Sequence, residues 1–188
     1  MFQKVLIANR GEVAVRIIRA CKEMGVRTVA VYSTADEESL HATLADEAYC
    51  IGGPRASESY LNIDAILTVA IASGASAVHP GYGFLSENVE FARECREHGL
   101  VFIGPSPEVM QRMGDKDEAR RTARAAGVPI VPGCDLLDSP EQAEAQARQI
   151  GCPVLVKARA GGGGRGIRKV ERPEDAAVAF ESASAEAQ

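Results

Sequence analysis

The sequence lacks paired cysteines, a long apolar run and an excess of basic residues. Its five cysteines are scattered without a C-x-x-C pair, which argues against both a disulfide framework and a zinc site. Every apolar run is too short to span a membrane or to serve as a secretory signal, so we expect a cytoplasmic protein. A net charge of −5 without a long basic block argues against a nucleic-acid or membrane partner, and any anion site has to be local.

Short β-branched runs alternate with helical patterns through the first hundred residues. The runs predict strands at residues 4–9, 27–33, 46–52, 75–81 and 100–104. Apolar residues at helical spacing predict helices at 11–24, 63–72 and 87–98 between them. This β-α-β rhythm predicts an α/β fold in which a parallel sheet carries helices on both faces.

Proline, glycine and capping residues punctuate the second half of the chain. Ser106 is predicted to cap a helix that ends at Gly114, and Asp115 is predicted to cap a helix that runs to about Ala126. The segment 127–133, GVPIVPG, breaks this pattern and is a candidate domain boundary. Beyond it the pattern predicts a helix over 139–150, strands at 151–157 and 166–170, and a helix over 173–186.

Four consecutive glycines, Gly161 to Gly164, lie between the last two predicted strands. With Gly166 they satisfy the formal pattern G-x-G-x-x-G, but a strand and not a helix follows, so the dinucleotide fingerprint does not apply. The Walker pattern fails as well, because Ile167 follows Gly166 where Lys-Ser or Lys-Thr is required. The glycines are therefore predicted to form a flap between two antiparallel strands.

A glycine flap is costly to order unless a ligand uses its bare backbone. Consecutive N–H groups can approach phosphate oxygens closely, and Lys157 and Arg165 add positive charge before and within the loop. These features indicate a triphosphate site; an exposed hairpin tip with ordinary surface cations is the alternative.

Lys116 gives an independent indication of a bound anion. A cation in the first turn of a helix is disfavoured by the helix dipole, and an anion nearby would reverse that cost. A solvated lysine that tolerates the cost is the alternative.

Four motifs together resemble one family. They are MFQKVLIANRGEVAVRIIRACKEMG at the N-terminus, HPGYGFLSEN at 79–88, FIGPSPEVMQRMGDK at 102–116 and PVLVKARAGGGGRGIRKV at 153–170. In sequence and in order they resemble the N-terminal part of biotin carboxylases, the ATP-grasp component of acetyl-CoA, propionyl-CoA and pyruvate carboxylases. The resemblance runs over essentially all 188 residues.

The resemblance implies two domains and an ATP site. Residues 1–114 correspond to the pre-ATP-grasp domain, a Rossmann-like parallel sheet that holds no dinucleotide. Residues 115–188 correspond to a truncated ATP-grasp domain with a linking helix and a glycine-rich lid. In the family, lysines at two of these positions contact ATP phosphates and the lid closes over them. The implied ATP-binding residues are Lys116, Lys157, Gly161, Gly162, Gly163, Gly164, Arg165 and Gly166.

The implied reaction is the first half-reaction of these carboxylases. Bicarbonate attacks the γ-phosphate of ATP to give carboxyphosphate, and the carboxyl group then moves to biotin on a biotin carboxyl carrier protein or domain. The implied cofactors are ATP, Mg2+ and biotin, and acetyl-CoA carboxylase would place the protein in fatty acid biosynthesis. The family's magnesium and bicarbonate motifs are expected beyond Gln188, so this chain should hold no metal ligand or catalytic residue and should be inactive alone.

The resemblance also gives a role to the HPGYG segment. Tyr82 and Gly83 would face the biotin side of the active site. The alternative is a structural turn in which Tyr82 packs, and for His79 a structural role is favoured.

The first helix carries a charged stripe formed by Arg16, Arg19 and Glu23. Such a stripe is usually a solvated face. Because biotin carboxylases often pair as homodimers, the stripe is also a candidate dimer contact.

Two other functions stay open at this point. One is a non-catalytic assembly or nucleotide-binding module. The other is a different ATP-grasp ligase, such as a carbamoyl-phosphate-forming enzyme, which activates bicarbonate without biotin. HPGYGFLSEN favours the biotin enzyme, but the residues leave the final acceptor open among acetyl-CoA, propionyl-CoA and pyruvate.

Overall fold

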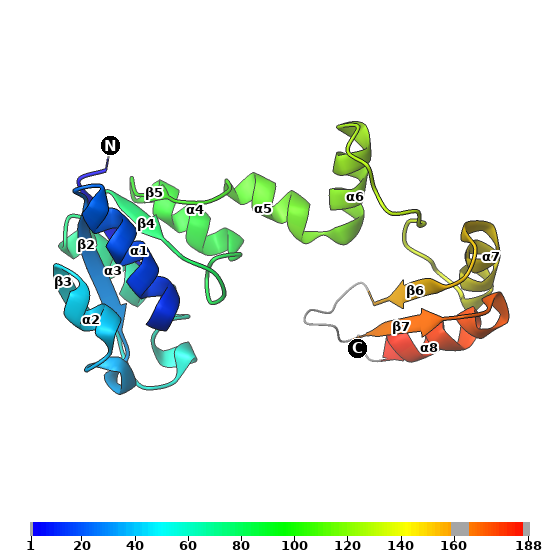
Figure 1. The fold of residues 1–188 in the computed structure, drawn as a ribbon, viewed down its shortest axis with the longest axis horizontal. Coiled ribbons are helices and arrows are strands. Elements are labelled where there is room, and N and C mark those ends of the chain that lie inside the picture. The colour runs from blue at the N-terminus through cyan, green and yellow to red at the C-terminus, as the bar shows by residue number, and fades with distance from the viewer. Residues whose placement is uncertain (1, 159–165, 186–188) are drawn as a thin grey trace. The chain divides into compact units, whose positions relative to one another are not determined.

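The structure, a computed structural model, describes residues 2–158 and 166–185, and for Lys116 the backbone only. The chain divides into two compact units, residues 1–114 and residues 115–188 (Figure 1). Each unit has its own sheet and its own cluster of buried apolar side chains.

Unit 1 is built on a five-stranded sheet. Its strands follow the order β3-β2-β1-β4-β5, and all four neighbouring pairs are parallel. The predicted parallel sheet is confirmed, although each strand is shorter than its apolar run because the runs include the first loop residues. The strands are β1 (Lys4–Ile7), β2 (Arg27–Tyr32), β3 (Glu47–Cys50), β4 (Ala77–His79) and β5 (Val101–Phe102).

Helices and 3-10 turns form the connections of unit 1. The three longer helices of the first hundred residues were expected from periodicity. Asn88 caps α4 by accepting a hydrogen bond from the Phe91 N–H at 2.8 Å, so this helix begins at Val89. The pattern missed α2 and both 3-10 turns, since segments this short give no periodic window. The elements are α1 (Gly11–Glu23), η1 (Thr34–Asp36), α2 (Leu40–Leu44), η2 (Ala56–Glu58), α3 (Ile63–Ala72), α4 (Val89–Glu97) and α5 (Pro107–Gly114).

Alternate residues of β1 enter two separate cores. Leu6 packs with Ile66 of α3 and Phe91 of α4, whereas Ile7 packs with Ile18 of α1. All of these side chains are fully buried, and burial of a side chain of this size contributes about 1.5–3 kcal/mol. The sheet is therefore covered on both faces, as the β-α-β rhythm predicts, and the carboxyl ends of β1 and β4 lie side by side.

Unit 2 packs an antiparallel hairpin against helices. Val170 of the hairpin is buried with Ala143 and Ala147 of α7 and Ala176 of α8. The two strands predicted around the glycines are confirmed, and the last predicted helix begins as a 3-10 turn. The elements are α6 (Lys116–Ala125), α7 (Pro140–Ile150), β6 (Val154–Lys157), β7 (Ile167–Val170), η3 (Pro173–Asp175) and α8 (Ala176–Ala185) (Figure 1).

The division between the units lies at Gly114 and Asp115, so the proline- and glycine-rich segment 127–133 is not the boundary that its pattern predicts. The Asp115 carboxylate caps α6 by accepting hydrogen bonds from the N–H groups of the second and third residues after it, at 2.9 and 3.0 Å. Arg120 of α6 then donates to the Val131 carbonyl at 3.3 Å. This bond ties segment 127–133 to unit 2.

Candidate functional site

The β6–β7 hairpin has one side on its helices and one exposed side, which we call the hairpin face: Leu155, Lys157, Ile167 and Lys169. Strand alternation puts Val154 and Val156 on the opposite, partly buried side. On the hairpin face Leu155 pairs with Lys169, and Lys157 pairs with Ile167. Leu155 is 56% exposed and Ile167 39%. The face therefore combines exposed apolar surface with two ammonium groups.

The two lysines of the hairpin face differ in their surroundings. The Lys169 Nζ lies 2.6 Å from the Glu171 Oε1, so its charge is paired. Among residues 2–158 and 166–185, no carboxylate lies within ion-pair distance of Lys157. Lys157 is thus the cation of this face that has its charge available for an anion.

The glycines predicted to bind ATP lie mostly outside the described residues. This holds for Gly161 to Gly164 and for Arg165. Gly166 is described: its φ is +70°, and its carbonyl accepts from the Ala158 N–H at 2.8 Å. A Cβ at Gly166 would lie 2.7 Å from the Ala158 Cβ, so this position needs glycine to close the hairpin.

Lys116 is the first residue of α6, directly after the capping residue Asp115. Its backbone is placed as the sequence predicts, in the first turn of a helix with a carboxylate cap. The side chain lies outside the described part of the chain.

The segment after β4 carries the residues predicted to face biotin. Tyr82 is 69% exposed, and Gly83 has a φ of +71°. The Asn9 Nδ2 at the end of β1 donates to the carbonyls of Pro80 (2.7 Å) and Tyr82 (2.9 Å). A side chain at Gly81, whose φ is +65°, would lie 2.8 Å from that same nitrogen. The loop is therefore fixed from β1, while the Tyr82 ring is exposed in this chain.

His79 holds the start of this loop from within. Its Nδ1 accepts a hydrogen bond from the Gly81 N–H at 3.0 Å, and burial lowers the pKa of the imidazole. A neutral ring that accepts a backbone N–H fits the structural role expected for His79.

The charged stripe of α1 is exposed along its length. Arg16, Arg19 and Glu23 all have exposed side chains. Arg16 lies 3.6 Å from Glu12 one turn earlier, a spacing that contributes only a few tenths of a kcal/mol. The stripe is therefore accessible.

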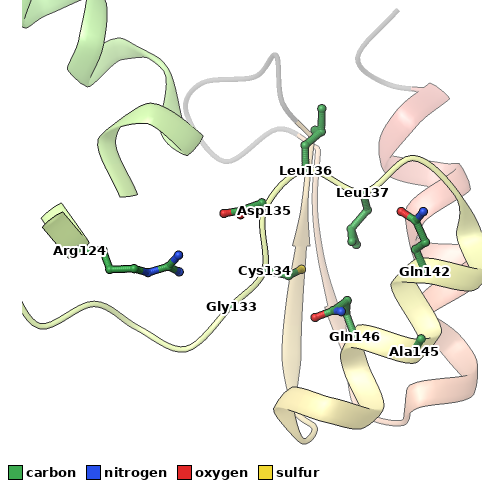
Figure 2. A pocket seen from close by; sticks show the side chains of 9 residues that line it. All are labelled: Arg124, Gly133, Cys134, Asp135, Leu136, Leu137, Gln142, Ala145 and Gln146. Carbon is green, nitrogen blue, oxygen red and sulfur yellow. The ribbon is translucent and has the colours of Figure 1, made fainter. Parts of the chain in front are cut away.

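A pocket of about 500 Å³ lies within unit 2, and no residue of the hairpin face lines it. Figure 2 shows Arg124 extending from α6 toward the segment 133–137, with α7 on the other side. None of the residues predicted to bind ATP lines it. The lining residues are Arg124, Gly133, Cys134, Asp135, Leu136, Leu137, Gln142, Ala145 and Gln146.

The described residues contain neither a candidate metal site nor a candidate membrane span. Over 2–158 and 166–185, no three His, Cys, Asp or Glu side chains gather in a way that could hold a metal ion. No helix in this part of the chain is both long enough and apolar enough to cross a membrane.

Sequence reasoning named neither the apolar residues of the hairpin face nor Asn9, which anchors the loop after β4. Leu155 and Ile167 were recognisable, because alternation along VLVK and IRKV puts them on the same side as Lys157. Asn9 was not, because its partners Pro80 and Tyr82 lie more than seventy residues away and meet it only once β1 and β4 pair.

Comparison with known proteins covers the whole chain. Residues 1–110 match the family model described as "Biotin carboxylase, N-terminal domain". Residues 115–188 match the model described as "Carbamoyl-phosphate synthase L chain, ATP binding domain".

Individual relatives agree with these models. A biotin carboxylase of Nostoc sp. is 54% identical over 187 residues, which is 99% of this chain and 42% of that protein. The solved biotin carboxylase–beta-gamma-ATP complex of Campylobacter jejuni is 50% identical, with a TM-score of 0.91, over 100% of this chain and 42% of that one.

The biotin carboxylase domain dimer of Hydrogenobacter thermophilus 2-oxoglutarate carboxylase, solved with MgADP, ADP and bicarbonate, is 51% identical with a TM-score of 0.88. It is matched over 100% of this chain and 41% of its own. The chain thus spans less than half the length of the relatives it matches. With its family model matched over residues 1–110, the chain belongs to the biotin carboxylase N-terminal domain family.

Proposed function

We propose that this chain forms the N-terminal part of an ATP-dependent biotin carboxylase, which uses bicarbonate to carboxylate biotin on a carrier protein or domain. The observation that carries the proposal is identity of 50% or more, over nearly all of the chain, to biotin carboxylases. Two of these relatives were solved with nucleotide, and one of them also with bicarbonate. The reaction is proposed for a protein of the relatives' full length.

The proposed division of work follows the two units. Residues 1–114 serve as the pre-ATP-grasp domain, and residues 115–188 supply the linking helix and the lid of the ATP-grasp domain. In the proposed reaction bicarbonate attacks the γ-phosphate of ATP and ADP leaves. The carboxyphosphate so formed then gives its carboxyl group to a ureido nitrogen of biotin, which loses its proton, and phosphate leaves. Positioning and charge neutralisation provide most of the catalysis in such phosphoryl transfers.

The hairpin face supports the nucleotide part of the proposal. A purine ring can cover Leu155 and Ile167, which removes exposed apolar surface from water, while a phosphate lies within reach of the unpaired Lys157. Lys116, the glycines Gly161 to Gly164, Arg165 and Gly166 are proposed to complete this site. The lid would also keep water from the hydrolysable carboxyphosphate.

The described residues do not fit a magnesium site, since no suitable group of carboxylates gathers in them. No step is therefore assigned to a metal held by this chain. We propose that Mg2+ and bicarbonate are bound by residues of the longer protein.

Unit 1 supplies the remaining proposed contacts. The exposed Tyr82 and Gly83 face the biotin side, and Arg16, Arg19 and Glu23 contribute to a homodimer. We further propose a cytoplasmic location. Acetyl-CoA carboxylase, with a role in fatty acid biosynthesis, is one of the enzymes to which such a protein could belong; propionyl-CoA and pyruvate carboxylases are the others.

A second candidate function has one observation in its favour. The model matched by residues 115–188 is that of a carbamoyl-phosphate synthase ATP-binding domain. A carbamoyl-phosphate-forming ligase shares bicarbonate activation but uses ammonia in place of biotin. The match of residues 1–110 to the biotin carboxylase model favours the biotin enzyme.

The test uses a fusion, called the extended chain, in which this chain is followed by the remaining residues of the Nostoc relative. Phosphate release from ATP is measured with bicarbonate alone, with free biotin added, and with ammonia added. Stimulation by biotin with formation of carboxybiotin is expected. Stimulation by ammonia alone would support the carbamoyl-phosphate alternative. Phosphate release no faster than in a mixture without protein would leave only a non-catalytic module.

A further inference from the structure

An ionic cluster around a buried carboxylate in unit 1 is used by none of the roles given above. Asp36, only 5% exposed, accepts hydrogen bonds from both the Nε and the Nη2 of Arg10. It also accepts from the hydroxyls of Tyr60 (2.7 Å), Ser33 (3.1 Å) and Ser39 (3.2 Å). The Arg10 bonds and the Tyr60 hydroxyl hold the pKa of the Asp36 carboxyl well below its usual range. The carboxylate is charged and fully committed to this cluster.

Tyr60 connects the cluster to the loop that carries Tyr82. Its hydroxyl donates to Asp36 and accepts from the Ser33 N–H at 3.0 Å, so the polar end of the ring is fixed. The face of the ring stacks on Phe84, with the centroids 5.1 Å apart and the planes inclined by 22°. Arg10 also lies over the Tyr60 ring, 6.0 Å from its centroid.

Phe84 needs such a support. Its φ is +43°, a left-handed conformation that L-residues other than glycine rarely adopt. Residues in this region persist when their surroundings determine them strongly, and they gather at functional sites. The stack on the buried Tyr60 holds Phe84 in this conformation and so fixes the loop on the C-terminal side of Tyr82.

The N-terminal part of the loop is held by Asn9, the residue next to Arg10. The Arg10 N–H donates to the Asn9 Oδ1 at 2.9 Å, which orients the amide. The Asn9 Nδ2 is thereby left to donate to the Pro80 and Tyr82 carbonyls. Two consecutive residues at the carboxyl end of β1 thus control both anchors of the loop, and the 69% exposed Tyr82 lies between them.

We propose that Asn9, Arg10, Asp36 and Tyr60 are positioning residues for the loop of Pro80 to Phe84, and that they hold Tyr82 and Gly83 in one conformation for the approaching biotin. The role toward biotin rests on the proposed function, whereas the ordering of the loop does not. An ion pair in which the Arg10 side chain is 48% exposed is weak evidence for stability alone, because water screens its attraction. The rival explanation is a cluster that only stabilises unit 1.

The first test measures hydrogen exchange of the amides in residues 79–86 of the extended chain. Tyr60→Leu removes both the stack and the hydroxyl, Tyr60→Phe restores the stack, and Tyr49→Leu is the control at an exposed tyrosine of β3. We expect exchange of the loop to rise about tenfold in Tyr60→Leu, with partial recovery in Tyr60→Phe and no change in the control. An equal rise in the loop and in β2 overturns the proposal, because it indicates general loss of stability.

Phe84→Leu covers the case in which Tyr60→Leu fails to fold, since Phe84 lies at the partly exposed side of the stack. It should raise exchange in residues 79–86 by a similar factor and leave the amides of β1 and β2 protected. Loop exchange like that of the unmodified chain overturns the proposal.

The second test measures kinetics of the same variants. The KM for free biotin should rise about tenfold in Tyr60→Leu, while the KM for ATP in the biotin-independent reaction stays constant. An equal change in both KM values overturns the role toward biotin. If the unmodified extended chain shows no biotin-dependent phosphate release, the proposed function fails, and the exchange experiment still decides whether the cluster orders the loop.

Discussion

Replacing Lys157 by alanine tests the hairpin face as a nucleotide site. Lys157 is exposed and has no ion-pair partner among the described residues, so its loss should change the stability of the free chain little. In a complex with ATP the variant would lose one charge-assisted hydrogen bond, worth about 1–3 kcal/mol. At 1.4 kcal/mol for each factor of ten, the Kd for ATP should rise about 5- to 150-fold.

Lys169→Ala is the matched control for this experiment. Lys169 lies on the same face of the same hairpin, and its replacement changes the net charge by the same amount. Because its ammonium group is paired with Glu171 at 2.6 Å, it has less charge to offer a phosphate. We expect the Kd for ATP to change less than about threefold.

Both variants are assayed by equilibrium titration with ATP, using the 188-residue chain and the extended chain at low and at high salt. The difference between wild type and Lys157→Ala should shrink at high salt, because exposed charges are screened. Equal losses in the two variants would show a non-specific charge effect. Unchanged affinity in Lys157→Ala would refute the assignment of this face to nucleotide phosphates.

Three further predictions concern other parts of the chain. Gly166→Ala puts a Cβ 2.7 Å from the Ala158 Cβ at a φ of +70°, so thermal unfolding should show unit 2 destabilised by about 1–2 kcal/mol. Ala158→Gly should recover part of this loss, and an unchanged Tm in Gly166→Ala would contradict the prediction. Burial lowers the pKa of His41, so below about pH 6.5 the unfolded state binds more protons than the folded state. The free energy of unfolding, measured with urea, should therefore fall as the pH drops through that value, and it should fall less in His41→Gln. A free energy of unfolding that stays constant between about pH 7 and pH 5 argues against this prediction. Arg19→Glu should weaken self-association of the extended chain in sedimentation experiments, and an unaltered dimer would return the α1 stripe to ordinary solvated surface.

The sheet and most helices could be predicted because each depends on local spacing. Val5 to Ile7 form a fully apolar run, as a strand covered on both faces requires, and Asn88 marks the start of α4 by its capping chemistry. The boundary at 127–133 was wrong because turn residues indicate where a helix ends, not where a core ends. The hydrogen bond from Arg120 to the Val131 carbonyl ties this segment to the same unit as α6, and the local sequence does not encode that bond.

The candidate site was predictable to the extent that its residues follow one another in the chain. Lys157 and the glycines stand out as a short pattern, and Leu155 follows from strand alternation. The cluster around Asp36 does not stand out, because its members come from the loops after β1 and β2 and from the segment before α3. Such long-range polar contacts arise from the strand order and not from any local composition.

The bond between the Ala158 N–H and the Gly166 carbonyl has a consequence for how this hairpin can change in evolution or engineering. It adds one hydrogen bond beyond the last pair of β6 and β7, Lys157 and Ile167. The register of the two strands is therefore set by residues outside the seven connecting positions 159–165. Insertions or deletions there should leave the strands in phase. Deletion of Lys157 from β6, by contrast, would shift the preceding residues by one and place Val154 and Val156 at the positions that Leu155 and Lys157 now occupy.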